Sequence, residues 1–594
     1  MKDDFAEKGQ GQIKKPSAQS IRDGFNGIFI REPDKIADPA TGCTVLIDAI
    51  LKDDKDKVAL LLKSGANPDK ANKEGKTPLH YAARLEKPEI AQLLLDSGAS
   101  ANARDKELQT PLFDALKLAD AAPMIALLLK GGASADIPDA EGKIPLHVAA
   151  DSGSVPVISL LMAATENPNH PDNRGFQPLH CAAKRNSAEA VSAILFGRVA
   201  ILSATKAGET CLHLAAARGA RDVVEGLLAT EAVLLVNAVN ATGQAPLHLA
   251  VRTGDIELCR ALIAAGAGVN MPDRDGYMPL HEAVRKKDAA LCRLLIQSGA
   301  EIDGPRVSAL VSPLAIAIES DDEAMAELLL KQGADVNAAD AQGTTPLMAA
   351  VWKTSEKIVT LLLSFGADAA AADKMGRNVL HIAGVGLSET TVARLIGAGA
   401  KINQRDTRQR TPLLVAIQSY KVAVAEMLLE EGADPNAADS DGATALHMAL
   451  NCRNQALVEK LLKKGADPNI AEHLQGKTPL HLACSLGMGG CADLLIRSKA
   501  NVNTKDSQGR TPLHLALYLY YPKDTVQKML EEGADPMIVD NDGMNPVDLA
   551  CGLNNRSVSD IFEKHLQEKG IIYKPKKPPA PPSPPWGGGY YCAV

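Results

Sequence analysis

Apolar residues recur at helical spacing through the segment from Gly75 to Ala99, GKTPLHYAARLEKPEIAQLLLDSGA. Leu79 and Ala83 fall on one face of a helix that we expect to begin at the proline. Proline lacks a backbone N–H, and in the first helical turn that group would have no partner within the helix. A short turn leads to a second helix, in which Ile90 and the leucines after it form the apolar stripe and Gly98 supplies a glycine end. The pattern predicts a pair of short helices that cannot bury its apolar face alone.

The same pattern recurs along most of the chain. We call the position of Thr77 the cap slot, because its side chain can cap the first helix. Successive cap slots are 33 or 34 residues apart, with one interval of 35, and the 16 copies cover roughly residues 39 to 570. The slot is held by Thr44, Thr77, Thr110, Ile144, Gln177, Thr210, Ala245, Met278, Ser312, Thr345, Asn378, Thr411, Thr444, Thr478, Thr511 and Asn545. A Gly–Ala pair closes most copies at a fixed offset, so two markers keep one register and predict a solenoid.

Two segments show the pattern most clearly: GADVNAADAQGTTPLMAAV from Gly333 to Val351 and NTKDSQGRTPLHLAL from Asn503 to Leu517. They resemble the ankyrin repeat, and the resemblance extends over about nine-tenths of the chain. It implies an all-α solenoid of helix–turn–helix repeats with hairpin-like loops, whose loop tips and first helices line a concave face. The sequence departs from the family pattern at Ser312 and in copies four to six, which lack the turn residues or the Gly–Ala pair, and loop shape stays open there.

The segments outside the repeats differ in composition from the repeats. We expect residues 1–38 to form a disordered or partly ordered leader, residues 39–570 the solenoid, and residues 571–594 a disordered tail rich in proline and glycine. In the tail, Lys576 followed by Pro579 and Pro582 matches a basic residue before PxxP, the type bound by Src-homology-3 grooves. The alternative is a disordered terminus without a partner.

Composition restricts the compartment and the kind of partner. The formal net charge of −8 argues against non-specific nucleic-acid binding. No run of 18 apolar residues is present, so we expect no membrane span, and the start of the chain lacks the apolar core of a secretory signal. The 10 cysteines are scattered without a CxxC pair, which indicates buried thiols in a reducing compartment. We therefore expect a cytoplasmic, monomeric protein.

Histidine recurs in one slot, three residues after the cap slot, which we call the histidine slot. Ten of the 13 histidines occupy it: His80, His147, His180, His213, His248, His281, His381, His447, His481 and His514. One interpretation is a ladder of metal ligands or bases. We favour local hydrogen bonding to the turn backbone, because Phe113, Ala315, Met348 and Leu414 hold the same slot in other copies. No catalytic motif and no further domain-sized segment is found, so we expect no catalysis, no cofactor and no metal.

Two slots near the end of the first helix, seven and eight residues after the cap slot, are candidates for partner binding; we call them the helix-end slots. In copies five to eight, six of these eight positions are basic and none is acidic: Lys184, Arg185, Arg218, Arg252, Arg285 and Lys286. Arg174, Lys206 and Arg274 lie in the neighbouring loop tips. We predict a basic stripe on the concave face that receives an acidic peptide or protein surface. The alternative is that charged residues simply favour exposed helix ends.

Later copies place aromatic residues in the same slots. Trp352 and Tyr518 are candidate interface anchors, although Tyr518 is equally open to a role in packing at the end of the stack. The leading function is a non-catalytic scaffold or adaptor that binds another protein along the concave face. Two alternatives stay open: a secreted, host-directed effector or toxin, and a regulator that inhibits a partner enzyme by occlusion.

Overall fold

The computed structural model describes residues 32–197, 199–304, 312–383, 387–518, 523–553 and 556–576. The chain divides into two compact units, unit 1 from Met1 to Ala300 and unit 2 from Glu301 to Val594. Copies one to eight of the repeat fall in unit 1 and the other eight in unit 2. The described residues form 32 α-helices, one 3₁₀ helix and one pair of short strands, which confirms the all-α solenoid expected from the sequence.

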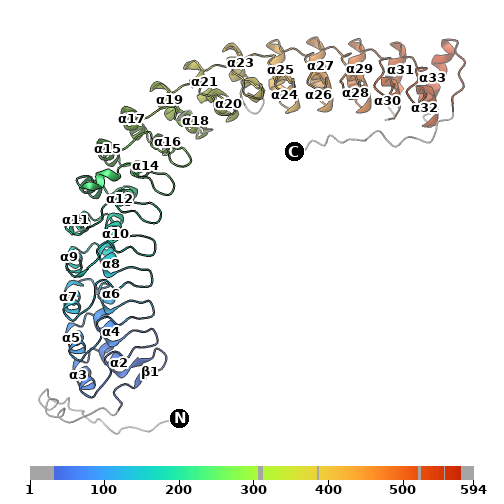
Figure 1. Cartoon of the computed structure of the whole chain (residues 1–594). Coiled ribbons are helices and arrows are strands. Elements are labelled where there is room, and N and C mark those ends of the chain that lie inside the picture. Colours follow the sequence, from blue (N-terminus) through green and yellow to red (C-terminus); the bar gives the residue numbers. More distant parts are fainter. Residues whose placement is uncertain are drawn as a thin grey trace, which may run out of the picture. The chain divides into compact units, whose positions relative to one another are not determined.

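In unit 1 the first helices of the repeats form one row and the second helices another, with the loops projecting beyond the first row (Figure 1). The first helices are α2 (Val45–Leu51), α4 (Pro78–Arg84), α6 (Pro111–Ala115), α8 (Pro145–Ser152), α10 (Pro178–Arg185), α12 (Cys211–Arg218), α14 (Pro246–Thr253) and α16 (Pro279–Arg285). The second helices are α3 (Lys55–Lys63), α5 (Pro88–Asp96), α7 (Ala122–Lys130), α9 (Val155–Ala164), α11 (Ala188–Leu195), α13 (Arg221–Leu228), α15 (Ile256–Ala264) and α17 (Ala289–Gln297). Strands β1 (Ile36–Asp38) and β2 (Cys43–Thr44) pair antiparallel before α2.

Unit 2 repeats the same alternation. Its first helices are α18 (Pro313–Glu319), α20 (Pro346–Trp352), α22 (Val379–Ile382), α24 (Pro412–Gln418), α26 (Ala445–Asn451), α28 (Pro479–Ser485), α30 (Pro512–Tyr518) and α32 (Pro546–Gly552). Its second helices are α19 (Glu323–Lys331), α21 (Glu356–Ser364), α23 (Glu389–Gly397), α25 (Val422–Glu430), α27 (Gln455–Lys463), α29 (Gly489–Arg497), α31 (Lys523–Glu531) and α33 (Arg556–Glu568). In either unit, the exposed ends of the first helices and the loop tips before them make up what we call the loop-side face.

The helices begin and end at the residues that the sequence indicates. Thr478 in the cap slot is extended, with φ −81° and ψ 164°, its hydroxyl accepts a hydrogen bond from the N–H of His481, and Pro479 takes the first helical position. Gly98 ends a second helix in the left-handed region, with φ +87°. A side chain at that position would strain the backbone even though nothing stands in its way.

The core of each repeat is small and aliphatic. Leu79, Ala82 and Leu94 are fully buried, and the equivalent positions of the other copies are buried in the same way. Alanine between the first helices lets them approach closely, so that α10 packs against both α8 and α12. Because each helix pair buries its apolar face against its neighbours, the stability of one repeat depends on the repeats beside it.

Neighbouring loop tips are joined by the backbone. The N–H of Lys206 donates to the carbonyl of Arg174 at 3.0 Å. Gly175 is required at this junction, because its φ is +84° and a β-carbon would lie 2.8 Å from the nitrogen of Lys206. Within the turn, the carboxylate of Asp172 accepts hydrogen bonds from the N–H groups of Arg174 and Phe176. The loop-side face is therefore ordered by the fold itself.

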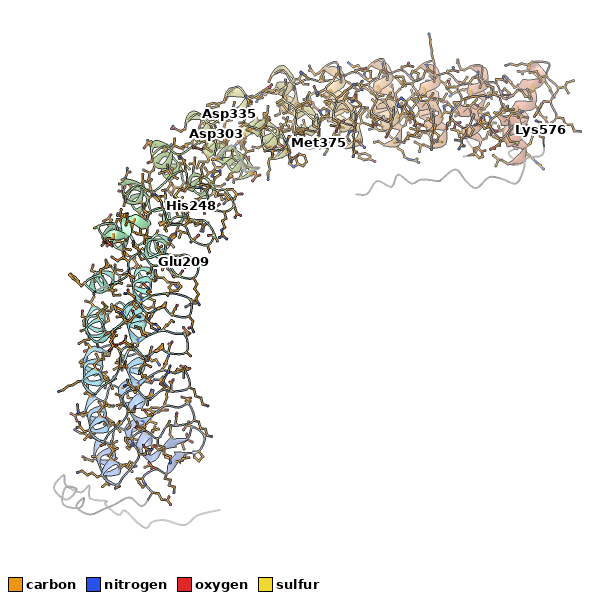
Figure 2. The ribbon with its side chains drawn as sticks, in the orientation of Figure 1. Glu209, His248, Asp303, Asp335, Met375 and Lys576 are labelled. Carbon is orange, nitrogen blue, oxygen red and sulfur yellow. The ribbon has the colours of Figure 1, made fainter. Side chains whose placement is uncertain are left out.

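The loops after the second helices are joined by side chains. The N–H of Asp335 donates to the carboxylate of Asp303 at 2.8 Å, and the two residues lie next to each other in Figure 2. Asn436 bridges two repeats with both ends of its amide, donating to the carbonyl of Gly465 at 3.0 Å and accepting from the N–H of Asp467 at 2.7 Å. Short polar side chains thus fix the repeat spacing on this side as well.

Two of the copies that lack the Gly–Ala pair end their second helix in their own way. In copy six the 3₁₀ helix η1 (Glu231–Leu235) fills the loop. In copy four the hydroxyl of Thr165 donates back to the last helical turn at 2.7 Å. At the other departure, Ser312 caps α18 with its side chain, while the loop before it, residues 305–311, lies outside the described residues. These substitutes leave the row of first helices intact.

The segment after α33 closes the last repeat. Asp548 holds the histidine slot of that repeat and is 0% exposed. It accepts hydrogen bonds from the hydroxyl of Tyr573, at 2.9 and 3.0 Å, and from the N–H of Lys576, at 2.7 Å. Where a histidine holds this slot it can bond to the following repeat, as Nε2 of His514 donates to the carbonyl of Met544. Residues 571–576 supply the corresponding partner for Asp548.

Candidate functional site

Basic side chains occupy the ends of four consecutive first helices on the loop-side face of unit 1. Helices α10, α12, α14 and α16 pack one against the next. The six predicted cations lie at or directly after the last turns of these helices, and all are exposed: Lys184, Arg185, Arg218, Arg252, Arg285 and Lys286. The fold therefore places the predicted residues along one face of adjacent helices.

The helix end by itself favours a positive charge. The unpaired carbonyl groups of the last turn carry partial negative charge, which stabilises a nearby cation. Arg218 and Arg285 lie in the last turns of α12 and α16. Part of the basic pattern is therefore explained without a partner protein. Whether a cation is free to bind an anion depends on its contacts within the chain.

The residue directly before the cap slot, which we call the pre-helix slot, is aromatic in copies five and eight. In both copies its ring lies against basic side chains. In copy five, Lys184 Nζ and Arg174 Cζ lie 5.4 and 5.5 Å from the ring centroid of Phe176. In copy eight, Arg285 Cζ lies 4.0 Å from the ring centroid of Tyr277. Cation–π contacts of this kind order a charged side chain without neutralising it. Lys184 and Arg174 therefore keep their capacity to pair with an anion, whereas Arg285 also lies 3.7 Å from a carboxylate oxygen of Glu282.

Histidines of the preceding repeats hold the backbone of both aromatic residues. Nε2 of His147 donates to the carbonyl of Phe176 at 2.8 Å, and Nε2 of His248 donates to that of Tyr277 at 3.2 Å (His248 is labelled in Figure 2). Each ring also meets the histidine of its own repeat edge-on, with 6.2 and 5.6 Å between centroids. The rings are thus fixed in position by the repeat scaffold.

Acidic residues interrupt the basic stripe in two places. Glu282 contacts two of the cations, with Oε1 3.2 Å from Arg252 Nε and Oε2 3.7 Å from Arg285 Nη1. Glu209 holds the pre-helix slot of copy six and is half-buried (Figure 2). Within the described part of the chain, Lys184 and Arg218 form no ion pair with a carboxylate. The stripe is therefore a row of cations with acidic side chains beside it at Glu209 and Glu282.

The predicted aromatic anchors of unit 2 are not brought together. Trp352 ends α20 and is 67% exposed, whereas Tyr518 ends α30, five repeats later, and is half-buried. In the tail motif, the side chain of Lys576 is exposed. Pro579 and Pro582 lie outside the described residues.

Arginines of unit 2 occupy the pre-helix slot and pair inside their own turn. Arg377, Arg410 and Arg510 each place Nη2 2.8 Å from a carboxylate oxygen of Asp373, Asp406 and Asp506, respectively. Burial raises the pKa of Asp406, but hydrogen bonds from the N–H and the guanidinium of Arg410 outweigh it and hold that pKa below its usual value. These arginines cannot take an external anion without giving up a buried partner.

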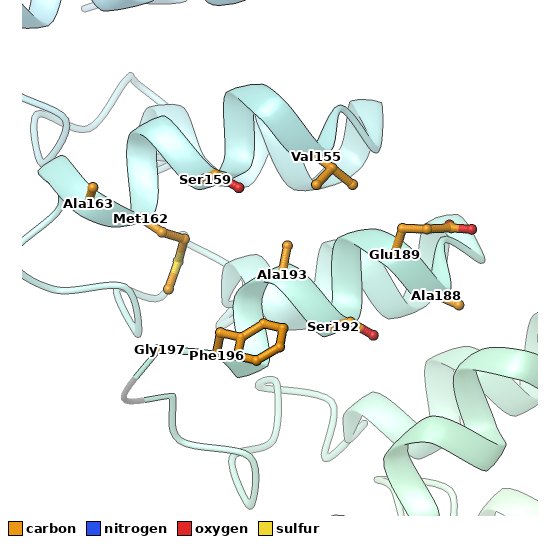
Figure 3. A pocket seen from close by; sticks show the side chains of 10 residues that line it. All are labelled: Val155, Ser159, Met162, Ala163, Ala188, Glu189, Ser192, Ala193, Phe196 and Gly197. Atoms are coloured by element: carbon orange, nitrogen blue, oxygen red, sulfur yellow. The ribbon is translucent and has the colours of Figure 1, made fainter.

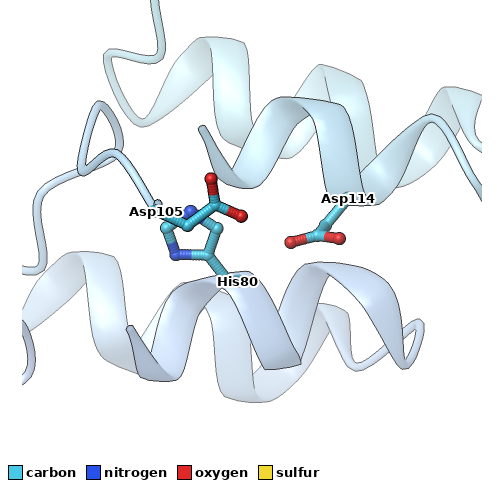
Figure 4. A group of neighbouring side chains, drawn as sticks. All are labelled: His80, Asp105 and Asp114. Carbon is cyan, nitrogen blue, oxygen red and sulfur yellow. The ribbon is translucent and has the colours of Figure 1, made fainter. Parts of the chain in front are cut away.

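His80, Asp105 and Asp114 converge in the interior of unit 1 (Figure 4), and such side chains can ligate a metal. Lys76 Nζ lies 3.0 Å from Oδ2 of both aspartates, so an ammonium group already fills the space between them. His80 uses both ring nitrogens: Nδ1 accepts from the N–H of its own cap slot, and Nε2 donates to the carbonyl of Gln109. With no free nitrogen lone pair and an internal cation, the group is a buried ion network.

The same hydrogen-bond pattern runs through the histidine slot. Nδ1 accepts from the cap-slot N–H, and in the described contacts Nε2 donates to a backbone carbonyl farther along the chain, as in His213 and His481. Burial lowers the pKa of all ten histidines, to about 4 for His281 and His481. Hydrogen bonding of these histidines to nearby backbone, predicted from the sequence, is confirmed.

Four cysteines of unit 1 offer little nucleophilic thiolate. Burial raises the pKa of Cys181, Cys211, Cys259 and Cys292 to about 12. A thiol with such a pKa stays protonated near neutral pH and reacts slowly.

A shallow groove opens on the second-helix side of unit 1, between α9 and α11 (Figure 3). Val155, Met162 and Phe196 are among the residues that line it, and Phe196 is 93% exposed. Glu189 is the ionisable side chain among its lining residues. The groove is thus apolar and lacks the cations of the loop-side face.

Phe176 and Tyr277 do not stand out in the sequence, since single aromatic residues are usually taken for packing. The signal that identifies them is positional. Both hold the pre-helix slot in copies whose helix-end slots are doubly basic, as with Lys184 and Arg285. Helical spacing alone does not show this contact, because the ring lies before the helix and the cation near its end.

Among the described residues, no helix combines the length and the apolar character that crossing a bilayer requires. The stacked helix pairs and the ordered loop-side face with its exposed side chains define a repeat solenoid. A family model described as ankyrin repeats in three copies matches residues 25–105, 164–235, 212–306, 311–373, 380–472 and 469–540, and a single ankyrin repeat matches residues 141–173. These matches cover most of the chain, which therefore belongs to the ankyrin repeat family.

Ankyrin repeats are generally protein–protein interaction modules and are typically non-catalytic. Among solved structures, the chain is similar to the ankyrin repeat domain of Bcl-3, described as a unique member of the IkappaB protein family. The two are 30% identical over 37% of this chain and 99% of that chain, with a TM-score of 0.34. Comparison with the curated proteins gives no match.

Proposed function

We propose that the chain is a non-catalytic scaffold or adaptor, and that the loop-side face of unit 1 binds an acidic segment of a partner protein. The observation that carries this proposal is the run of exposed cations at the ends of α10, α12, α14 and α16. Lys184 and Arg218 form no ion pair within the described residues, so an incoming carboxylate can pair with them without breaking an internal contact.

The contact would spread over several repeats, and its affinity would depend on a few anchors. Aromatic residues enriched in interfaces are scarce in this chain, which makes Trp352 a candidate for a separate contact on unit 2. We further propose that the protein acts as a cytoplasmic monomer, in keeping with its scattered, buried thiols.

The proline-rich tail is a second candidate contact. The N–H of Lys576 is bonded to buried Asp548, so the motif that continues to Pro579 and Pro582 would begin at a fixed point on unit 2. Affinity capture with the intact chain and with a chain ending at residue 576 tests this. Partners lost with the tail would assign recognition to the motif, and partners kept by both would assign it to the repeats.

The acidic-partner proposal is tested with a peptide of about 20 residues rich in aspartate and glutamate, compared with its asparagine and glutamine counterpart. We expect the acidic peptide to bind the full chain at about 50 mM salt and to weaken at about 300 mM, because salt screens exposed charges. The combined substitutions Arg218→Glu, Arg252→Glu and Arg285→Glu should lower its affinity by at least about tenfold.

The matched control reverses three exposed cations on the second helices of the same unit, Lys63, Lys130 and Arg293. It changes the net charge equally and should leave most of the affinity in place. An equal loss in both variants would reduce the effect to net charge and contradict the proposal. If a captured partner is an enzyme, its activity in the complex distinguishes an adaptor from an inhibitor that occludes the active site.

A further inference from the structure

The cations of the loop-side face differ in how firmly they are held. Phe176 supports Lys184 and Arg174, and Tyr277 supports Arg285. Each ring belongs to a residue whose carbonyl is bonded to a histidine of the preceding repeat. A cation already ordered by a fixed ring loses less conformational entropy when it pairs with an anion. Copies five and eight therefore each contain a cation ordered by a ring, and at copy eight an incoming anion would share Arg285 with Glu282, whose carboxylate oxygen lies 3.7 Å away.

The positions between these two contacts have a different chemistry. The pre-helix slots of copies six and seven hold Glu209 and Gln244, both half-buried. The carboxylate of Glu209 would repel an acidic side chain of the partner at that position. A carboxylate and an amide can instead bond to the N–H and C=O groups of an extended backbone, which otherwise lack partners. An α-helical partner satisfies its backbone internally and would gain nothing from these two residues.

The distance between the two contacts follows from the stacking of the repeats. Helices α10, α12, α14 and α16 pack consecutively, so copies five and eight are three helix-to-helix steps apart. At about 9 Å for each step, the two contacts are about 27 Å apart. An extended peptide rises about 3.3 Å per residue and covers that distance in about eight residues. An α-helix rises about 1.5 Å per residue and would need about 18.

We propose that unit 1 binds an extended peptide through two acidic anchors about eight residues apart, one at Lys184 and Arg174 beside Phe176 and the other at Arg285 beside Tyr277. The peptide backbone between the anchors lies along Glu209 and Gln244 and carries no acidic residue opposite Glu209. This inference rests on the proposed function, since it specifies the acidic partner of the same face.

A series of synthetic peptides tests the spacing. Each peptide carries two pairs of aspartates separated by a proline-rich spacer, which keeps an extended helix of about 3.1 Å per residue. Spacers from about 3 to about 20 residues are titrated against the full chain at low salt, with fluorescence anisotropy as the readout. We expect the tightest binding at about eight or nine residues between anchors, about tenfold tighter than a peptide with one anchor.

Conservative variants of the rings sharpen the test. Phe176→Leu and Tyr277→Leu keep all charges, and each should remove the preference for one spacing while single-anchor peptides still bind. Phe365→Leu is the matched control, because Phe365 is an exposed aromatic residue of unit 2, 37% exposed, and should leave the preference unchanged.

The outcomes separate the inference from the proposed function. Binding that depends on charge and salt but not on spacing would overturn the two-anchor inference and leave the acidic-partner proposal standing. An optimum near 18 residues, or a preference unaffected by either ring variant, would also overturn the inference. Failure of every acidic peptide to bind at low salt would contradict the proposed function and the inference together.

Discussion

The pre-helix slot serves different purposes in copies five and eight of unit 1 and in three repeats of unit 2, although Lys76 in copy two of unit 1 also pairs with buried aspartates. In unit 2 the pre-helix slot holds arginines that pair with a buried aspartate of their own turn, as Arg510 pairs with Asp506. In unit 1 the same slot holds Phe176 and Tyr277, and the cations come from the helix end and the loop tip. Arg377, Arg410 and Arg510 are therefore held inside their own turns, whereas the cations beside the two rings of unit 1 lie on exposed helix ends and loop tips, with a carboxylate oxygen of Glu282 3.7 Å from Arg285.

The comparison shows how little a basic residue reveals by its type alone. A guanidinium bonded to a buried carboxylate has its donors in use. A guanidinium lying on an aromatic ring is equally well ordered, yet its charge is not neutralised. The residue in the pre-helix slot distinguishes the two cases: Arg510 in that slot pairs with the aspartate of its own turn, whereas Phe176 or Tyr277 in that slot lies against a cation from elsewhere in the repeat.

The largest expected difference between the units is their response to acid. The neutral histidines of the histidine slot have folded pKa values below the ordinary 6.5, so their stabilisation is complete above pH 6.5 and is lost as the pH falls towards 4. At pH 5, His281 and His481 should each cost about 2 kcal/mol, because protonated Nδ1 would face the cap-slot N–H. Unit 1 has six such histidines, His80, His147, His180, His213, His248 and His281, and unit 2 has four, His381, His447, His481 and His514.

Unit 1 should therefore lose protection first when the pH is lowered from about 7.5 to about 5. Hydrogen exchange of the full chain, read by mass spectrometry and corrected for the intrinsic pH dependence of exchange, measures this. Simultaneous loss in both units, or earlier loss in unit 2, would contradict the role given to the histidine slot.

Removing one arginine from each unit should separate stability from binding. Arg510→Gln leaves Asp506 buried without its cation and should lower the free energy of unfolding by about 3 kcal/mol, with little effect on acidic-peptide affinity. Arg285→Gln should lower the free energy of unfolding by less than about 1 kcal/mol, since the arginine side chain is largely exposed, but it should weaken binding of the acidic peptide. Denaturant unfolding and peptide titration of both variants check this pattern. Similar changes in both variants would remove the distinction between the units.

The two ends of the described repeats provide a matched pair of tyrosines. Tyr573 donates to the buried carboxylate of Asp548, and Tyr573→Phe should cost about 2 kcal/mol, because a charged acceptor loses a donor. Tyr81 in unit 1 accepts from the amide of Asn72 at 2.9 Å, and Tyr81→Phe should cost about 1 kcal/mol. Thermal unfolding monitored by circular dichroism compares them. A larger loss for Tyr81→Phe would contradict the closing role of residues 571–576.

The smallest expected effect concerns the cap slot. Thr478 Oγ1 lies 2.8 Å from His481 Nδ1. The hydroxyl of buried Thr110 has no hydrogen-bond partner among the described residues, and Phe113 stands in its histidine slot. Thr478→Val should cost about 1 kcal/mol, and Thr110→Val should be neutral or slightly stabilising. Equal losses on denaturant unfolding would show that the histidine partner is not what makes the hydroxyl useful.

The fold could be predicted from the sequence because the same pattern recurs in 16 copies. One copy leaves the helix ends ambiguous, but proline after the cap slot and glycine after the second helix recur at fixed offsets, and the structure confirms both at Pro479 and Gly98. The hydrogen bonding of the histidines to nearby backbone was also predicted, because other side chains hold the same slot in several copies, which a metal or catalytic site would not tolerate.

The candidate site could be predicted only in part. The spacing placed Lys184 and Arg285 on one face, but it gave no indication that Glu282 contacts two of the cations. The support from Phe176 and Tyr277 was also missed, because it joins the start of a repeat to the end of its first helix across a turn. Contacts of this kind depend on side-chain direction, which residue spacing does not specify.

The most direct test of the division between the units is a hydrogen-exchange footprint of the acidic peptide on the full chain at low salt. The account predicts added protection in the loop tips and helix ends of unit 1, residues 174–185, 206–218, 244–252 and 274–286, with no change around the paired arginines of unit 2. Protection confined to unit 2, or spread evenly over both units, would contradict it.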